Sequence, residues 1–139
     1  MIRQVKWVFL AVSLLAGLSF HAGCQDTKSP PGETQKAVYH RVSPEQAKEM
    51  MNKGNSYTLL DVRTEAEFRE QRIKGAVLLP NVEIKNRAGT ELPDKNALIF
   101  VYCRSGVRSA GAAKELVSMG YTNVYDIGGI INWPYETVR

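Results

Sequence analysis

The sequence predicts a three-layer α/β sandwich with a mostly parallel central sheet. Apolar runs of strand length alternate with helical patterns over about 100 residues, as in successive βαβ units. The run over 97–102 is apolar throughout, which is typical of a middle strand in a parallel sheet covered on both faces. Right-handed crossovers are expected between the parallel strands. A chain of 139 residues has room for one such domain after a terminal segment is set aside.

The domain is predicted to begin with a strand, a helix and a second strand. Residues 38–42 alternate enough for a short strand. Ser43 then has the position of an N-cap, with Pro44 at the first helical position, and Gly54 ends the helix. Residues 57–62 form the next strand, which is expected to be buried.

A second helix and a third strand follow. Thr64 and Glu67 have the spacing of a capping box, which predicts a short helix starting at Glu65. The apolar residues 76–79 form the third strand. Pro80 closes it, because proline cannot donate a ladder hydrogen bond.

The segment before the central strand is predicted to be a loop. Residues 86–95 are mostly polar, and Gly89 and Pro93 interrupt any regular pattern. The strand over 97–102 comes next and is the most apolar run of the domain. It is therefore expected to lie at the centre of the sheet.

The last third of the domain is predicted to hold one long helix and one strand. The helix spans about residues 107–119 and ends at Gly120. The residues of this helix that are expected to face inward are Ala110, Ala113, Leu116 and Val117. A strand over 123–127 follows and leads into a turn at 128–129.

The first 24 residues have the pattern of a signal peptide. Arg3 and Lys6 form a short positive region, and an apolar run over 7–20 follows. This run is shorter than the roughly 20 residues that a membrane-spanning helix needs. It ends in Ala-Gly-Cys, which resembles a bacterial lipobox, so Cys24 is predicted to receive lipid and become the mature N-terminus.

The lipoprotein interpretation implies export to the periplasmic side of a bacterial membrane. His21 departs from the lipobox, which usually has an aliphatic residue there, so an uncleaved anchor and a soluble secreted protein remain alternatives. Residues 25–37 are polar and contain Pro30-Pro31, which is typical of a flexible tether. Residues 38–139 are then the folded domain.

Composition excludes two classes of partner. The net charge of +4 is modest, and Arg3 and Lys6 contribute to it from the predicted signal peptide, so no nucleic acid is expected. The chain has two cysteines, Cys24 and Cys103, two histidines and no Cys-x-x-Cys pair. The sequence therefore predicts no zinc site and no other metal or cofactor.

Cys103 is predicted to be a reactive thiolate. It lies where the central strand passes through a loop into a helix, and ligands of open α/β sheets bind at the carboxyl ends of strands. The helix start offers unpaired N–H groups and the positive end of its dipole, and Gly106 allows the loop amides to converge. Arg104 and Arg108 add positive charge. These factors favour the charged thiol. The alternative is a buried, inert cysteine.

Four motifs resemble those of the rhodanese family of sulfurtransferases, in the same order along the chain. They are Leu60-Asp61-Val62-Arg63 with Glu67-Phe68, Ile73-Lys74-Gly75-Ala76 with Leu79-Pro80, the run from Tyr102 to Ser109, and Gly128-Gly129 with Trp133. Two departures fall in the second motif, where Gln71-Arg72 replaces Gly-His and Lys74 replaces proline. The resemblance implies a rhodanese-like fold from residue 38 onward.

The resemblance also implies an activity. Cys103 would take sulfane sulfur from an anionic donor such as thiosulfate, become a persulfide, and pass the sulfur to a thiol or cyanide. The backbone amides of the loop would bind the sulfur, and its two arginine side chains would attract the donor; the loop residues are Arg104, Ser105, Gly106, Val107 and Arg108. Asp61 and Arg63 either hold this loop or form an ordinary structural ion pair. No cofactor is implied.

Two other functions remain open at this stage. Cysteine-dependent phosphatases and arsenate reductases place an arginine after five intervening residues; here Ser109 has that position and Arg108 comes one residue earlier. The second alternative is a rhodanese-fold module that binds partners or senses redox state without catalysis. A self-contained disulfide switch is not predicted, because Cys103 lacks a second cysteine in the domain.

Overall fold

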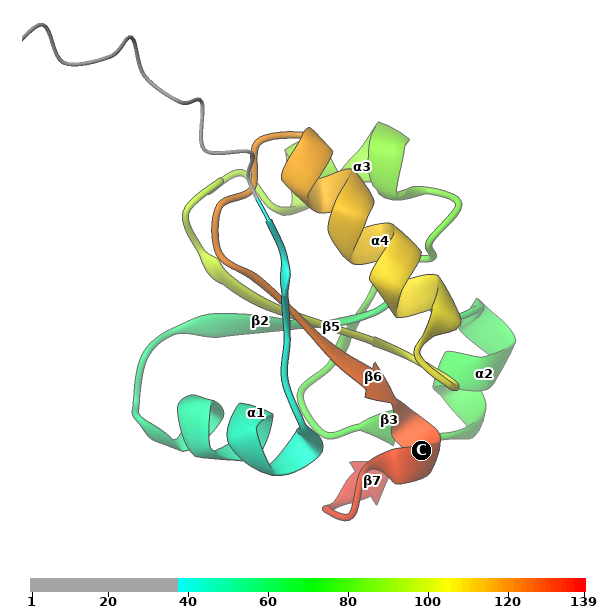
Figure 1. The fold of residues 1–139 in the computed structure, drawn as a ribbon. Coiled ribbons are helices and arrows are strands. Elements are labelled where there is room, and N and C mark those ends of the chain that lie inside the picture. The colour runs from blue at the N-terminus through cyan, green and yellow to red at the C-terminus, as the bar shows by residue number, and fades with distance from the viewer. Residues whose placement is uncertain (1–37) are drawn as a thin grey trace, which may run out of the picture. The chain divides into compact units, whose positions relative to one another are not determined.

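The computed structural model describes residues 38–139, so the predicted signal peptide, Cys24 and the tether lie outside the described residues (Figure 1). The elements, in chain order, are β1 (His40–Arg41), α1 (Pro44–Asn52), β2 (Tyr57–Asp61), α2 (Glu65–Glu70), β3 (Arg72–Ile73), β4 (Val77–Leu78), α3 (Ile84–Glu91), β5 (Leu98–Cys103), α4 (Val107–Ser118), β6 (Val124–Gly129), the 3-10 helix η1 (Ile130–Asn132) and β7 (Thr137–Val138).

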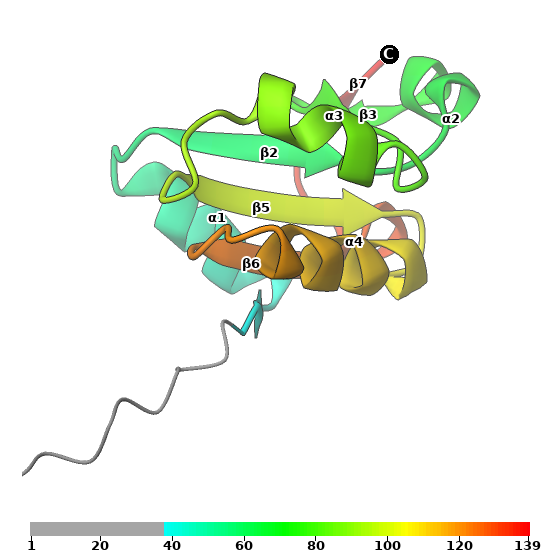
Figure 2. The same ribbon diagram turned by 90° about the horizontal axis from the view of Figure 1, so that it is seen from above.

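The main sheet has five strands in the order β1-β6-β5-β2-β4, and every pair in it is parallel. Figure 1 shows α3 and α4 on one side of this sheet and α1 on the other. Seen from above, β2 and β5 run side by side in the same direction (Figure 2). The predicted fold class, a three-layer α/β sandwich with a mostly parallel sheet, is therefore confirmed.

The strand β5 lies at the centre of the sheet, as its apolar sequence predicts. Its residues from Ile99 to Cys103 are all buried. One core cluster joins β5 to α3 and α4, and the other joins it to α1 and Trp133. The strand is thus covered on both faces, which explains why it carries no polar alternation.

The first two helices begin as their capping residues predict. The Ser43 hydroxyl accepts the N–H of Gln46, and the Gln46 side chain accepts the N–H of Ser43. Thr64 and Glu67 exchange the corresponding pair of hydrogen bonds at the start of α2. Both helices thus satisfy otherwise unpaired N–H groups in their first turn.

The predicted loop over 86–95 is wrong, because most of it belongs to α3. Ile84 and Ala88 are buried in the core one helical turn apart, and Leu92 caps the helix with its side chain also buried. Packing of this apolar face outweighs the weak propensity of Gly89. Pro93 follows the helix directly and does not interrupt it.

Two further corrections concern α4 and the end of the chain. The buried face of α4 consists of Ser109, Ala112, Ala113 and Leu116, whereas Ala110 and Val117 are only half-buried. The strand predicted over 123–127 does not end before a turn at 128–129, because β6 continues to Gly129. Its pairing with β5 shifts register between Val101 and Tyr102. The short antiparallel pair β3–β7 has no counterpart in the sequence analysis.

Candidate active site

Cys103 is the last residue of β5, and α4 begins four residues later at Val107. The sulfur is buried, and the Gly106 N–H donates a hydrogen bond to it at 3.0 Å. Gly106 has a φ of 101°, a left-handed conformation that disfavours other residues. This conformation turns the loop back so that its backbone N–H groups point toward the Cys103 sulfur.

Burial and hydrogen bonding act in opposite directions on the Cys103 thiol. Burial raises its pKa, but hydrogen bonds from the backbone N–H groups of Ser109, Gly106 and Ser105 lower it, and the net pKa is below the ordinary value. Donors that point at a sulfur stabilise its anion more than its neutral form. The site therefore stabilises the thiolate form of Cys103 more than an apolar core position would.

The loop residues divide between the surface and the interior. Arg104, Ser105 and Val107 are exposed, whereas Gly106 is buried. The Arg104 side chain makes no hydrogen bond or ion pair with any other residue in the range 38–139. Arg104 is thus the loop cation that stays available to an anion arriving from solvent.

Arg108 is bound to Glu67 of α2. Its two terminal nitrogens donate to the two carboxylate oxygens of Glu67 at 2.8 and 2.7 Å. The Arg108 hydrogen bond lowers the pKa of Glu67 to about 2, against burial, with help from Thr64. The sequence analysis considered Glu67 only as a helix cap and a family motif, so this partner of Arg108 was missed. Part of the charge of Arg108 is compensated.

Asp61 and Arg63 form a buried ion pair. The Arg63 Nη2 atom lies 2.6 Å from Asp61 Oδ2 and also donates to the carbonyl of Gln71 at 2.6 Å. None of the hydrogen bonds of either side chain reaches residues 104–108. The geometry therefore favours the structural alternative for this pair, which braces the end of β2 against the end of α2.

Three residues that the sequence analysis did not assign to the site lie directly behind the loop. The Ser109 hydroxyl donates to Asp126 Oδ1 at 2.6 Å, and both residues are buried. A Cβ on Gly129 would lie 2.3 Å from the carbonyl oxygen of Arg104, so only glycine fits there. The sequence held one signal for Asp126, an aspartate within a strand of mostly apolar residues. Charged residues are rarely fully buried unless they are paired, so this position could have been identified as a candidate.

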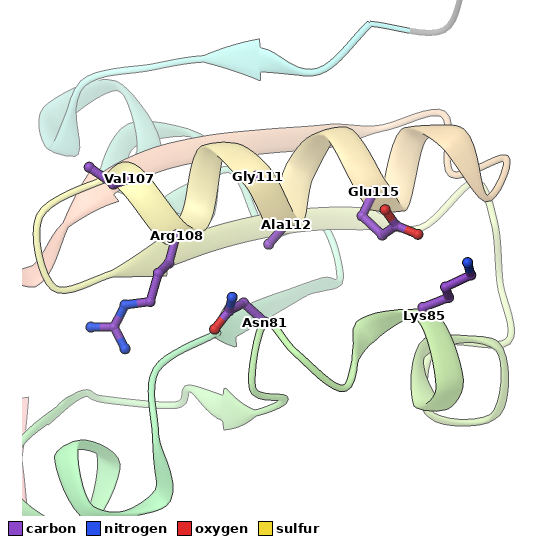
Figure 3. Close-up of a pocket in the computed structure, with 7 residues that line it drawn as sticks. All are labelled: Asn81, Lys85, Val107, Arg108, Gly111, Ala112 and Glu115. Carbon is purple, nitrogen blue, oxygen red and sulfur yellow. The ribbon is translucent and has the colours of Figure 1, made fainter.

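Open cavities flank the loop on two sides. One has a volume of about 390 Å³ and includes Arg63, Glu67, Arg104 and Ile131 in its lining. The other, of about 470 Å³, is a groove with Val107 and Arg108 at one end and Lys85 and Glu115 at the other (Figure 3). Both volumes are in the range of small-molecule sites.

The described part of the chain offers no metal centre and no membrane span. No group of three or more potential ligands (His, Cys, Asp or Glu) comes together among residues 38–139. None of the helices in this range has the length and apolarity needed to cross a bilayer. Cys103 is the free cysteine of the range.

Comparison with known proteins agrees with the fold. The Rhodanese-like domain family matches residues 43–134. Thiosulfate sulfurtransferase PspE of Escherichia coli is 43% identical over 72 residues, which are 51% of this chain and 68% of that protein. Thiosulfate sulfurtransferase GlpE of Haemophilus influenzae is 38% identical over 96 residues, which are 68% of this chain and 88% of that protein. A solved structure described as rhodanese with anions from E. coli superimposes with a TM-score of 0.57 and 34% identity, covering 60% of this chain and 99% of its own. The chain therefore belongs to the rhodanese-like domain family.

Proposed function

We propose that this protein is a sulfurtransferase that carries sulfane sulfur on Cys103. The observation that carries the proposal is the buried thiol at the end of β5, which accepts an amide hydrogen bond and has a lowered pKa. The relatives named thiosulfate sulfurtransferase support thiosulfate as the donor. Thiol compounds or cyanide are the proposed acceptors.

The first half-reaction forms a persulfide. The Cys103 thiolate attacks the outer sulfur of thiosulfate, a new S–S bond forms, and the S–S bond of thiosulfate breaks. Sulfite leaves with the electron pair of the broken bond. The loop amides then stabilise the negative charge that the terminal persulfide sulfur carries, as they stabilised the thiolate.

The second half-reaction returns the enzyme to its thiolate. An acceptor thiolate or cyanide attacks the terminal sulfur, and the bond between that sulfur and Cys103 breaks, leaving the electron pair on Cys103. No general base is required, because the acceptor attacks as an anion and Cys103 leaves as one, so no proton is transferred in this step. His40, the one histidine among residues 38–139, belongs to β1 and stacks on Tyr125.

The geometry does not favour a phosphatase. A phosphatase loop would require an arginine at the position of Ser109, and this residue is buried and bonded to Asp126. Arg108, one position earlier, is bonded to Glu67. Neither side chain is placed to surround a tetrahedral oxyanion.

Intact mass spectrometry tests the proposed function. The purified protein incubated with thiosulfate should gain about 32 mass units, the mass of one sulfur, and cyanide should remove it. Cys103→Ser should gain nothing, because a serine hydroxyl is not ionised near neutral pH. Failure of the wild type to gain sulfur from thiosulfate, mercaptopyruvate or a persulfide, with Cys103 still alkylatable, would leave the binding module as the better hypothesis.

We further propose that the protein is exported and held on the periplasmic side of a membrane by lipid on Cys24. Support comes from the sequence of residues 1–24 alone, which lie outside the described residues. Cell fractionation should place the wild type with membranes, and Cys24→Ala should block its processing or release it. Full-length, unmodified protein in the cytosol would contradict this proposal.

A further inference from the structure

One of the two cavities beside the Cys103 loop opens at the end of the sheet that carries the sulfur. Cys103 and Gly129 are register partners at the ends of β5 and β6. Arg104 and Ile130, which follow them directly in the chain, both line the cavity of about 390 Å³. The Ile131 N–H donates to the Arg104 carbonyl at 3.3 Å and joins these two segments. The cavity therefore begins one residue beyond Cys103.

Another part of the lining comes from the end of α2. Figure 2 shows α2 at the end of the sheet toward which β2 and β5 point. Glu67 and Glu70 of this helix and Gln71, which follows it, line the same cavity as Arg104. Ligands of open α/β sheets bind at the carboxyl ends of the strands, so the whole cavity lies where a substrate is expected.

Four charged side chains line the cavity, and two of them are already paired within the protein. Arg63 and Glu67 form the ion pairs described above. The other two, Arg104 and Glu70, are exposed, and neither has a hydrogen bond or an ion pair with another residue in the range 38–139. The cavity thus offers an entering molecule one free cation and one free anion.

The stability of α2 does not account for Glu70. This residue is the last of the helix, where unpaired carbonyl groups and the negative end of the dipole disfavour a carboxylate. Arg69, the basic residue of the last turn, is paired with Glu65. Binding of thiosulfate does not account for Glu70 either, because a carboxylate repels an anionic donor. Glu70 is placed to attract a cationic group instead.

We propose that this cavity is the acceptor site of the sulfur transfer and that it takes small zwitterionic thiols, which Glu70 selects by their ammonium group. Arg104 binds the carboxylate of the same acceptor. Sulfite has left before the acceptor enters, so Arg104 can serve the donor in the first half-reaction and the acceptor in the second. A volume of about 390 Å³ has room for a thiol of amino-acid size.

The acceptor role rests on the proposed function, but the charge selection can be measured without a sulfur donor. The Cys103 thiolate attacks one sulfur of a small disulfide, forms a mixed disulfide and releases the other half as a thiolate. The probes are cystamine, which is a dication, hydroxyethyl disulfide, which is neutral, and dithiodipropionate, which is a dianion. Their rates are read on the Cys103 peptide of the full-length protein by mass spectrometry.

Glu70→Gln should slow the reaction with cystamine about two- to fivefold relative to hydroxyethyl disulfide, which is the effect of one exposed charge. High salt should reduce this difference, because it screens the charge. Glu70→Lys should slow cystamine further and accelerate dithiodipropionate. Arg104→Ala should slow dithiodipropionate relative to the neutral probe. Because Glu70 is exposed, its substitutions remove no core packing.

Glu65→Gln is the matched control. It removes the same charge from the same helix, but Glu65 lies outside the cavity. The ratios of the three rates should therefore stay as in the wild type.

The second test measures the acceptor step on protein that has been loaded with thiosulfate. Cysteine, a zwitterionic thiol, and mercaptoethanol, a neutral one, each remove the added sulfur. Glu70→Gln should slow removal by cysteine about two- to fivefold and leave removal by mercaptoethanol unchanged. The same substitution should not slow loading from thiosulfate, because the carboxylate that it removes repels this donor.

The assignment of Glu70 would be overturned by a cystamine preference that is the same in the wild type, Glu70→Gln and Glu70→Lys, or that falls equally in Glu65→Gln. Absence of reaction with all three disulfides would also overturn it. Removal of sulfur by cysteine at a rate independent of Glu70 would contradict the zwitterionic acceptor. If thiosulfate does not load the wild type but cystamine selection depends on Glu70, the sulfurtransferase function is contradicted and the ammonium site stands.

Discussion

The inner and outer sides of the Cys103 loop differ in burial and in what their polar groups contact. On the inner side, Asp61, Ser109 and Asp126 are fully buried and bond to other protein groups. On the outer side, the Val107 side chain is 79% exposed, and Arg104 extends to solvent. The comparison indicates that the interior sets the geometry of the sulfur and its hydrogen bonds, whereas the exposed side is the part of the loop that a molecule from solvent can contact.

The largest stability effect is expected for a buried charge on the inner side. Asp61→Ala leaves the Arg63 guanidinium, which is 5% exposed, without its carboxylate. The free energy of unfolding should fall by about 3–5 kcal/mol in urea titrations. Glu49→Ala breaks an exposed pair with Lys53 and should cost less than about 1 kcal/mol. Equal losses for the two variants would remove the distinction between the buried and exposed sides.

Two glycines test how tightly the inner side holds the loop. A Cβ on Gly129 would lie 2.3 Å from the Arg104 carbonyl oxygen and 2.6 Å from the Ser105 Cα, so Gly129→Ala must displace the loop backbone. We expect a loss of about 1–3 kcal/mol and slower sulfur loading from thiosulfate. Gly111→Ala, in α4 with nothing within 4 Å of its Cβ, should instead stabilise by about 1 kcal/mol. A Gly129→Ala protein that loads as fast as the wild type would show that the loop tolerates the shift.

The Glu67–Arg108 pair, half-buried between the two sides, should produce a measurable acid sensitivity. The pKa of Glu67 is lowered from 4.5 to about 2 in the folded protein, so the unfolded chain binds a proton more readily. The stabilisation is therefore complete above pH 4.5 and is lost as the pH falls toward 2. Glu67→Gln should cost about 1 kcal/mol at pH 7 and flatten the loss of stability between these pH values. If the free energies of unfolding of the wild type and Glu67→Gln differ by the same amount at pH 7 and at pH 3, this prediction is wrong.

Sequence patterns located Cys103 because the features that define its site are contiguous: an apolar strand, a glycine and a helix start. The partners behind and beside the loop could not be found in this way. Glu67 is 41 residues from Arg108, and Asp126 is 17 residues from Ser109, so both contacts depend on strand order and helix placement. The helix α3 was missed for a related reason, because its stability comes from burial of Ile84 and Ala88 rather than from its own composition.

The smallest effect is expected at Arg104, on the outer side, and it should appear only with charged donors. The Arg104 side chain has no protein partner in the described range and lies beside the cavity that Ile131 lines. Arg104→Ala should therefore raise the thiosulfate KM a few-fold at low salt, and the difference should shrink as salt screens the charge. Cys103 alkylation by the neutral reagent iodoacetamide should keep its rate, because the amide hydrogen bonds to the sulfur remain.

Lys114→Ala, an exposed cation of α4 outside both cavities, is the control for a general change in net charge and should leave the KM unchanged. An equal rise in KM for both variants would mean that the whole surface attracts the donor, and a slower alkylation of Arg104→Ala would mean that Arg104 also acts on the sulfur from the outer side.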